Sequence, residues 1–221
     1  ALRAPGNWGR TSPRLARPQC GAAQTPTGPS HRAGPVGPGR CYGRILAMSR
    51  PRISVFIARS VDGYIATDDD SLDWLMAAGV EGEDYGFDSF LTDVDVVAMG
   101  RSTYEFIKDF PELPYGNRPV HVFTTRDPGP RGGFEFYART PVEAVQHWRA
   151  QGVGHVYLDG GTLISQFLDA GFVDDMTLTS VPVLLGSGKP LFHRIERATP
   201  LRLVGSQVFP SGMINLRYER T

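Results

Sequence analysis

Three short segments of this sequence combine glycine, hydroxyl side chains and arginine in a way that suits the binding of anions. They are Gly100-Arg101-Ser102-Thr103, Thr124-Thr125-Arg126 and Gly160-Gly161-Thr162. Hydroxyl and guanidinium groups donate hydrogen bonds to phosphate oxygens, and glycine lets backbone N–H groups come close to a ligand. If the fold brings the three segments together, they suit a ligand with several phosphate groups, such as a dinucleotide.

Each of these segments follows a predicted strand, and two of them begin a predicted helix. Apolar or β-branched runs predict strands over residues 53–58, 94–100, 118–125, 134–137, 155–159, 174–185, 200–209 and 213–220. Helices are predicted over 83–91, 101–107, 140–152 and 162–171, and a solvated acidic loop over 67–74. The clearest helix ends are those of 140–152, where Thr140, Pro141 and Glu143 form an N-terminal capping pattern and Gly152 follows the last turn.

The order of these elements predicts an α/β fold. Strands and helices alternate over the first two-thirds of residues 51–221, and the last third is strand after strand. This pattern favours a mostly parallel central sheet with helices on both faces, completed by an antiparallel strand pair. Right-handed crossovers then place the strand-to-helix turns at one edge of the sheet, where ligands of such folds bind. We therefore expect one site, in which Gly160 and Gly161 leave room for a pyrophosphate.

The composition divides the chain into two parts. Residues 1–50 contain eight Arg, seven Pro and eight Gly but no Asp, Glu or Lys, and we expect this arm to be disordered. Nucleic-acid binding and organelle targeting are both open to such an arm, but its only aromatic residues are Trp8 and Tyr42 and its prolines oppose an amphipathic helix. A further alternative is that Met48 is the natural start. Residues 51–221 hold 15 basic and 23 acidic residues, a net charge of −8.

Several function classes are disfavoured for residues 51–221. Both cysteines, Cys20 and Cys41, lie in the arm, which excludes a disulfide framework, a thiol nucleophile and a cysteine-ligated zinc site from this part. The histidines and carboxylates have no metal-binding spacing, and no apolar run is long enough to span a membrane. The Rossmann and Walker patterns are also absent. We expect a single cytoplasmic domain with no bound metal, no membrane and no nucleic-acid partner.

Five segments, in order and spacing, resemble the dihydrofolate reductase superfamily. They are "SVDGYIA" (60–66), "VVAMGRSTYE" (96–105), "FTTR" (123–126), "VYLDGGTLISQFL" (156–168) and "VDDMTLTSVPVLLGSGKPLF" (173–192). The resemblance is closest to the branch containing the reductase domain of bacterial riboflavin biosynthesis (RibD C-terminal domain-like), and it covers residues 52–220. Asp159 before only two glycines, and Ile164 where folate reductases have an aromatic residue, favour this branch. It implies a three-layer α/β/α fold, NADPH as cofactor and a homodimer.

The resemblance also implies roles for individual residues. The positions that would hold the cofactor are Ala58, Ile65, Gly100, Arg101, Ser102, Thr103, Thr124, Thr125, Arg126, Gly160, Gly161, Thr162 and Leu163. Asp62, Leu185 and Gly186 match the substrate side of the site. Asp84, 16 residues before Gly100, is the candidate catalytic acid, with Asp88 one turn further along the same helix face. The alternative is that both are surface acids.

The function implied is an NADPH-dependent reductase of a small heterocycle, like the 5-amino-6-(5-phosphoribosylamino)uracil reductase domain of riboflavin biosynthesis. Two alternatives stay open. One is a dihydrofolate or pteridine reductase. The other is a non-catalytic homologue that binds a nucleotide on the same scaffold.

Overall fold

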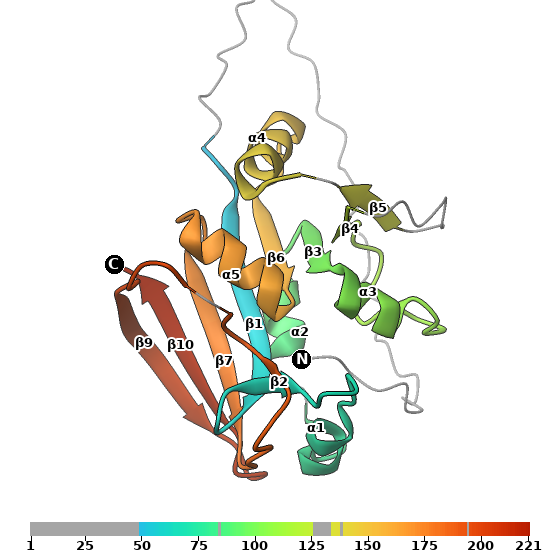
Figure 1. The fold of residues 1–221 in the computed structure, drawn as a ribbon, viewed down its shortest axis with the longest axis vertical. Helices are drawn as coiled ribbons and strands as arrows, with labels where there is room; N and C mark the ends of the chain where they lie inside the picture. Colours follow the sequence, from blue (N-terminus) through green and yellow to red (C-terminus); the bar gives the residue numbers. More distant parts are fainter. Residues whose placement is uncertain (1–48, 84, 126–133, 138, 194) are drawn as a thin grey trace, which may run out of the picture. The chain divides into compact units, whose positions relative to one another are not determined.

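The central feature of the fold is an eight-stranded sheet, shown in Figure 1. The computed structural model describes residues 49–83, 85–125, 134–137, 139–193 and 195–221. In spatial order the strands are β5 (Phe134–Tyr137), β4 (Val120–Phe123), β3 (Val96–Gly100), β6 (His155–Asp159), β1 (Arg52–Ser60), β7 (Asp175–Val181), β10 (Ile214–Arg220) and β9 (Leu201–Val208). The first six run parallel, and β10 is antiparallel to both of its neighbours.

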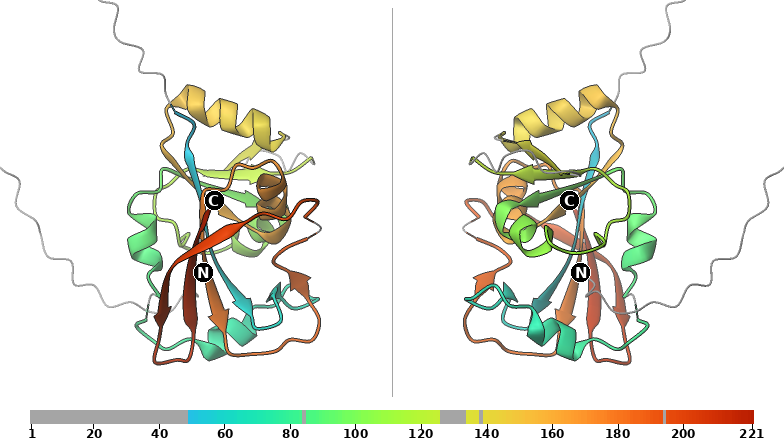
Figure 2. Two further views of the ribbon diagram at one scale, coloured as in Figure 1. Left: turned by 90° about the vertical axis from the view of Figure 1, so that its left-hand side faces the viewer. Right: turned by 90° about the vertical axis from the view of Figure 1, so that its right-hand side faces the viewer.

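Helices cover both faces of this sheet and make a three-layer arrangement. The helices α4 (Pro141–Gln151) and α5 (Gly161–Asp169) pack on one face, in a cluster that includes Ile53, Val55 and Trp148. The helices α2 (Phe87–Leu91) and α3 (Arg101–Ile107) pack on the other face, in a cluster that includes Phe56 and Met99. Figure 2 shows α2 and α5 on opposite sides of the sheet. Burial on both faces explains why the central strands read as nearly continuous apolar runs.

Most predicted elements are confirmed, and α4 is the best example. Thr140 has extended backbone angles, its hydroxyl accepts a hydrogen bond from the backbone N–H of Glu143 at 3.4 Å, and its own N–H donates to the Glu143 carboxylate at 2.8 Å. Gly152 ends the helix with a φ of 75°. The predicted mostly parallel sheet and the antiparallel C-terminal pair β9–β10 are also present.

Other predictions were wrong in their bounds. The helix predicted over 83–91 contains only Phe87–Leu91, because Tyr85 and Gly86 have φ values of 53° and 85° and form a left-handed turn. The strand predicted over 174–185 ends at Val181, since Pro182 has no N–H for the sheet.

Three short elements were not predicted. They are α1 (Asp73–Ala78), within and beyond the predicted acidic loop, and the strands β2 (Tyr64–Ala66) and β8 (Lys189–Pro190). These strands are too short to give a periodic signal, yet they pair as a separate two-stranded sheet. This pairing brings the segment around Lys189 beside the end of β1.

Candidate active site

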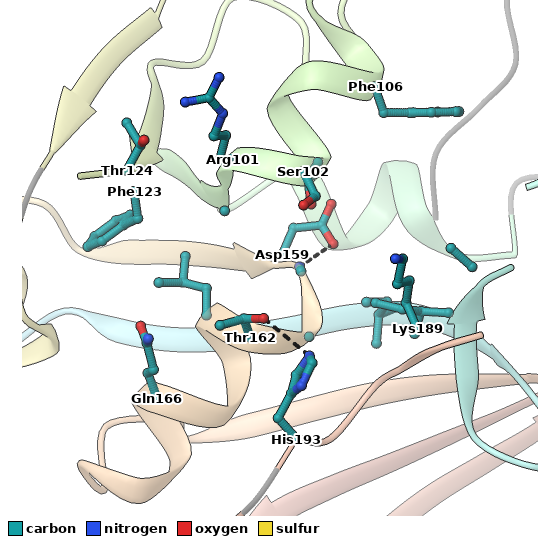
Figure 3. Close-up of a pocket in the computed structure, with 18 of the residues that line it drawn as sticks. Arg101, Ser102, Phe106, Phe123, Thr124, Asp159, Thr162, Gln166, Lys189 and His193 are labelled. Carbon is teal, nitrogen blue, oxygen red and sulfur yellow. Dashed lines mark hydrogen bonds between the residues drawn. The ribbon is translucent and has the colours of Figure 1, made fainter. Parts of the chain in front are cut away.

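A cavity of about 970 Å³ lies at the carboxyl ends of β1, β3, β4 and β6. The structure gathers in its lining all of the predicted cofactor-binding residues that it describes: Ala58, Ile65, Gly100, Arg101, Ser102, Thr103, Thr124, Thr125, Gly160, Gly161, Thr162 and Leu163. Arg126 lies outside the described residues. Figure 3 shows Arg101 and Ser102 across the cavity from Thr162, with Asp159 between them. The described residues of the three segments predicted to bind anions therefore meet at one sheet edge.

The N-termini of two helices contribute residues to the lining of this cavity. The residues at the N-terminus of α3 and α5 line it, and neither helix has a side-chain cap. In α5 the hydrogen bond from the N–H of Ile164 to the carbonyl of Gly160, at 2.9 Å, lies within the first turn. The N–H groups before it have no partner further back in the helix. Such N–H groups, together with the helix dipole, favour an anion.

At Gly160 and Gly161 the protein itself leaves little room for a side chain. Gly160 has a φ of 93°, and a Cβ there would lie 2.9 Å from Oγ1 of Thr103. A Cβ on Gly161 would lie 2.6 and 2.7 Å from the carbonyl oxygens of Pro190 and Leu191. Gly161 therefore lets α5 pack on the β8 segment, and the expectation that a side chain here would also block a pyrophosphate stays a prediction. It is Gly100 whose added Cβ would meet no atom within 4 Å.

The acid that the structure places at this cavity is Asp159, the last residue of β6. Its side chain is 6% exposed, its Oδ1 accepts a hydrogen bond from the N–H of Gly160 at 2.8 Å, and its Oδ2 lies 3.5 Å from the hydroxyl of Tyr115. Burial raises the pKa of Asp159. Burial likewise raises the pKa values of Tyr115 and Tyr157, which surround it, so both phenols stay protonated. Burial, which outweighs the hydrogen bonds from Gly160 and Tyr115, therefore makes Asp159 easier to protonate than an exposed aspartate.

The structure does not place either predicted acid of the segment 84–88 in this cavity. Asp84 is outside the described residues. Asp88 is exposed on α2 and does not line the cavity.

Asp62, Leu185 and Gly186 do meet one another. The Asp62 carboxylate accepts hydrogen bonds from the hydroxyl of Ser60 at 2.6 Å and from the N–H groups of Leu185 at 3.2 Å and Gly186 at 2.7 Å. These bonds, that of Ser60 first, lower the pKa of Asp62. None of the three residues lines the cavity. Asp62 instead ties the β1–β2 turn to the chain after β7.

Further polar residues of the cavity were missed from the sequence. Among them are Tyr137, Arg139, Gln166, Lys189 and His193. The hydroxyl of Thr162 lies 3.2 Å from Nε2 of His193. Lys189 and His193 reach the cavity through the β2–β8 pairing, and no local motif could have indicated that. Figure 3 shows Lys189 and His193 approaching from the side of β8.

The described residues were also compared with the requirements of a membrane-spanning helix and of a metal site. Within the described residues, no helix has the length and apolar character needed to cross a membrane. Across the same residues, no group of three or more histidine, cysteine or carboxylate side chains is placed to hold a metal ion.

Comparison with known proteins relates the chain to a family of reductase-like domains. The family described as the RibD C-terminal domain matches residues 117–215. The uncharacterized protein YwjB of Bacillus subtilis is 36% identical over 169 residues, which cover 75% of this chain and 96% of YwjB. A crystal structure from Shewanella sp. PV-4, provisionally named a riboflavin biosynthesis protein, has 33% identity and a TM-score of 0.72, covering 77% of this chain and 99% of that one.

More distant structures share the fold. The diaminohydroxyphosphoribosylaminopyrimidine deaminase/5-amino-6-(5-phosphoribosylamino)uracil reductase of Thermotoga maritima has 16% identity and a TM-score of 0.60, covering 78% of this chain and 57% of that one. Dihydrofolate reductase from Enterococcus faecalis, complexed with NADP(H) and RAB-propyl, has 16% identity and a TM-score of 0.54, covering 77% of this chain and 96% of that one. The fold is thus that of dihydrofolate reductase.

Proposed function

Because the chain belongs to the family of the RibD C-terminal domain, we propose that it is an NADPH-dependent reductase of a small heterocyclic substrate. The substrate that we favour is a ribosylated aminopyrimidine of the kind named for the Thermotoga protein. The observation that carries the proposal is the shared cavity whose lining contains a buried carboxyl group and the described residues of the three segments predicted to bind anions.

The cavity suits the phosphate-bearing half of a dinucleotide. Its volume of about 970 Å³ lies at the upper end of the usual range for small-molecule and cofactor sites. Uncapped N-termini of α3 and α5, the hydroxyls of Ser102 and Thr162, and the guanidinium of Arg101 supply donors for phosphate oxygens. Bound NADPH would supply the hydride for reduction of a C=N or C=O group.

The remaining surface of the cavity suits a flat heterocycle. Ala58, Ile65, Leu72, Leu75 and Phe106 contribute apolar groups to its lining. Such groups exclude water from the reacting atoms and hold the substrate against the cofactor. Asp159 is the only carboxyl group of the described cavity lining that is buried, and the others, Asp70 and Glu143, are exposed.

In this proposal Asp159 donates the proton that the substrate takes up during reduction. Hydride transfer to carbon leaves negative charge on the neighbouring heteroatom, and a protonated carboxyl group beside it can neutralise that charge. Because burial raises the pKa of Asp159, this residue can keep its proton until the substrate takes it. The N–H of Gly160 donates to Oδ1 and the hydroxyl of Tyr115 lies 3.5 Å from Oδ2, so both oxygens of this carboxyl group are held in place.

The proposal predicts substrate-dependent oxidation of NADPH. The purified full-length chain is mixed with NADPH and either 5-amino-6-(5-phosphoribosylamino)uracil, dihydrofolate or a dihydropteridine, and the loss of NADPH absorbance is followed. We expect turnover with the pyrimidine. Turnover only with dihydrofolate or the pteridine would show that the substrate is a pteridine and not a ribosylated aminopyrimidine. Binding of NADPH without turnover of any of the three compounds would favour a non-catalytic nucleotide-binding protein.

A further inference from the structure

One end of the cavity is formed by residues that none of the sequence motifs covered. Here Tyr137, at the end of β5, and Arg139, just before α4, lie in the same lining as Thr124, Thr125 and Thr140. The central guanidinium carbon of Arg139 lies 5.2 Å from the ring centroid of Tyr137. This distance is within the range of a cation–π contact, which holds the planar guanidinium over the ring.

Tyr137 itself is fixed by its surroundings. Its hydroxyl donates to Oε2 of Glu135 at 2.5 Å and lies 3.5 Å from Nε2 of both His121 and His147. Its ring packs at 4.6 Å on that of His121, whose Nδ1 accepts a hydrogen bond from Nε1 of Trp148 at 2.9 Å. Only 9% of Tyr137 is exposed. The aromatic surface beneath Arg139 is therefore rigid.

The two arginines of the described cavity lining differ in how far their charge is already compensated. Arg101 pairs with Glu105 at 3.1 Å, and Glu105 also binds Lys108 at 2.6 Å. Within the described residues, no ion pair of Arg139 with a carboxylate is present. The nearby Glu143 carboxylate accepts hydrogen bonds from the N–H and the hydroxyl of Thr140, both at 2.8 Å. These bonds and, after them, the charge of Arg139 lower the pKa of Glu143. Arg139 is thus near a carboxylate of the cavity lining but is not held in an ion pair with it.

We propose that Arg139, held on the ring of Tyr137, binds the 2′-phosphate of NADPH together with Arg101 and sets the preference for NADPH over NADH. A planar guanidinium can give two parallel hydrogen bonds to a phosphate group, and threonine hydroxyls beside it can add further donors. This inference rests on the proposed function, since it concerns the cofactor of the same cavity. It adds to the Gly100–Thr103 segment a further residue that selects NADPH over NADH.

The test compares the affinities of NADPH and NADH for Arg139→Ala, Arg101→Ala and a control, Arg149→Ala. Arg149 lies in the last turn of α4, is exposed and does not line the cavity. Affinities are measured by fluorescence titration of the nicotinamide, and 2′,5′-ADP and 5′-AMP are used as competing ligands. Loss of a charge-assisted contact should weaken NADPH and 2′,5′-ADP by roughly tenfold or more in Arg139→Ala. NADH and 5′-AMP should change by less than about twofold, a small fraction of that effect.

Three results would overturn the inference. Equal weakening of NADPH and NADH in Arg139→Ala would show that the residue contacts another part of the cofactor, and unchanged affinities would show that it contacts none. Wild-type protein that binds neither dinucleotide would overturn the proposed function as well, which separates the two failures. Because Arg139 is exposed, the variant should unfold at the same temperature as wild type, and this checks that its fold is intact.

Discussion

At the scale of single residues, the proposed reduction depends on Asp159 as the proton donor. It lies at the end of β6 with its carboxyl group buried, and the buried hydroxyl of Tyr115 is beside it. Charge on this carboxylate is unfavourable in such surroundings, so burial raises the pKa of Asp159. If the protonated form donates the proton in reduction, turnover must fall as the pH rises through that raised pKa.

Replacement of Asp159 by Asn tests this role. The Asn side chain keeps an oxygen that can accept from the N–H of Gly160 but has no acidic proton. We expect the turnover number to fall by about a hundredfold, the lower end of what a general acid contributes, and the alkaline decline to disappear from its pH profile. NADPH affinity should change by less than about twofold, well under 1 kcal/mol. Unchanged turnover and an unchanged pH profile in Asp159→Asn would remove the residue from the reaction.

Residues of the site differ in how far the sequence could reveal them. Arg101, Thr124 and Thr162 stand in local segments whose composition already suits an anion, and the structure places them in one cavity. Arg139 and Lys189 carry no such local pattern, because they reach the cavity only through the pairing of β5 with β4 and of β8 with β2. Asp159 was noticed for the glycines after it, but its acidity depends on burial that only the packed structure provides.

At the scale of elements, the strand-to-helix turns determine both packing and access. The turn from β6 to α5 contains Gly161, whose position is closed by the carbonyl oxygens of Pro190 and Leu191. The turn from β3 to α3 contains Gly100, where the position of a Cβ is open. Gly161, the first residue of α5, is thus required by packing within the protein, whereas Gly100, the N-cap of α3, has room for a side chain in the structure.

A matched pair of alanine variants distinguishes these two positions. Gly161→Ala forces the backbone of α5 or β8 to move, and we expect the free energy of unfolding to fall by about 1–3 kcal/mol, as for other overpacked sites. Gly100→Ala should change it by less than about 0.5 kcal/mol, because nothing is displaced in the protein. Its NADPH affinity should fall by about tenfold or more, since the added methyl group would meet the cofactor. Urea unfolding and NADPH titration measure both quantities, and equal stability of the two variants would contradict this assignment.

The elements themselves were largely predictable where their signals are local. The helix α4 begins and ends as its capping residues indicate, because Thr140, Glu143 and Gly152 act within one turn of the helix ends. The helix predicted around α2 was too long, because the left-handed backbone angles of Tyr85 and Gly86 cannot be recognised from the pattern of apolar residues. The strands β2 and β8 were missed because their pairing joins segments more than a hundred residues apart.

At the scale of the whole molecule, the strand order explains why distant segments form one site. Four parallel strands, β4, β3, β6 and β1, are neighbours in the sheet and end at the same edge. The sequence predicted the alternation of strands and helices, but the order of the strands follows from long-range packing. The expected homodimer stays a prediction, and so does the expectation for residues 1–50, nearly all of which lie outside the described part of the chain.

The central claim is that this cavity binds NADPH, and calorimetric titration of the full-length chain with NADPH and NADH tests it most directly. We expect one NADPH per chain, with an affinity at least about tenfold higher than that for NADH, as one charge-assisted phosphate contact provides. Binding should weaken in Gly100→Ala, which narrows the cavity without disturbing the packing. Absence of NADPH binding, or binding that Gly100→Ala leaves unchanged, would contradict the account.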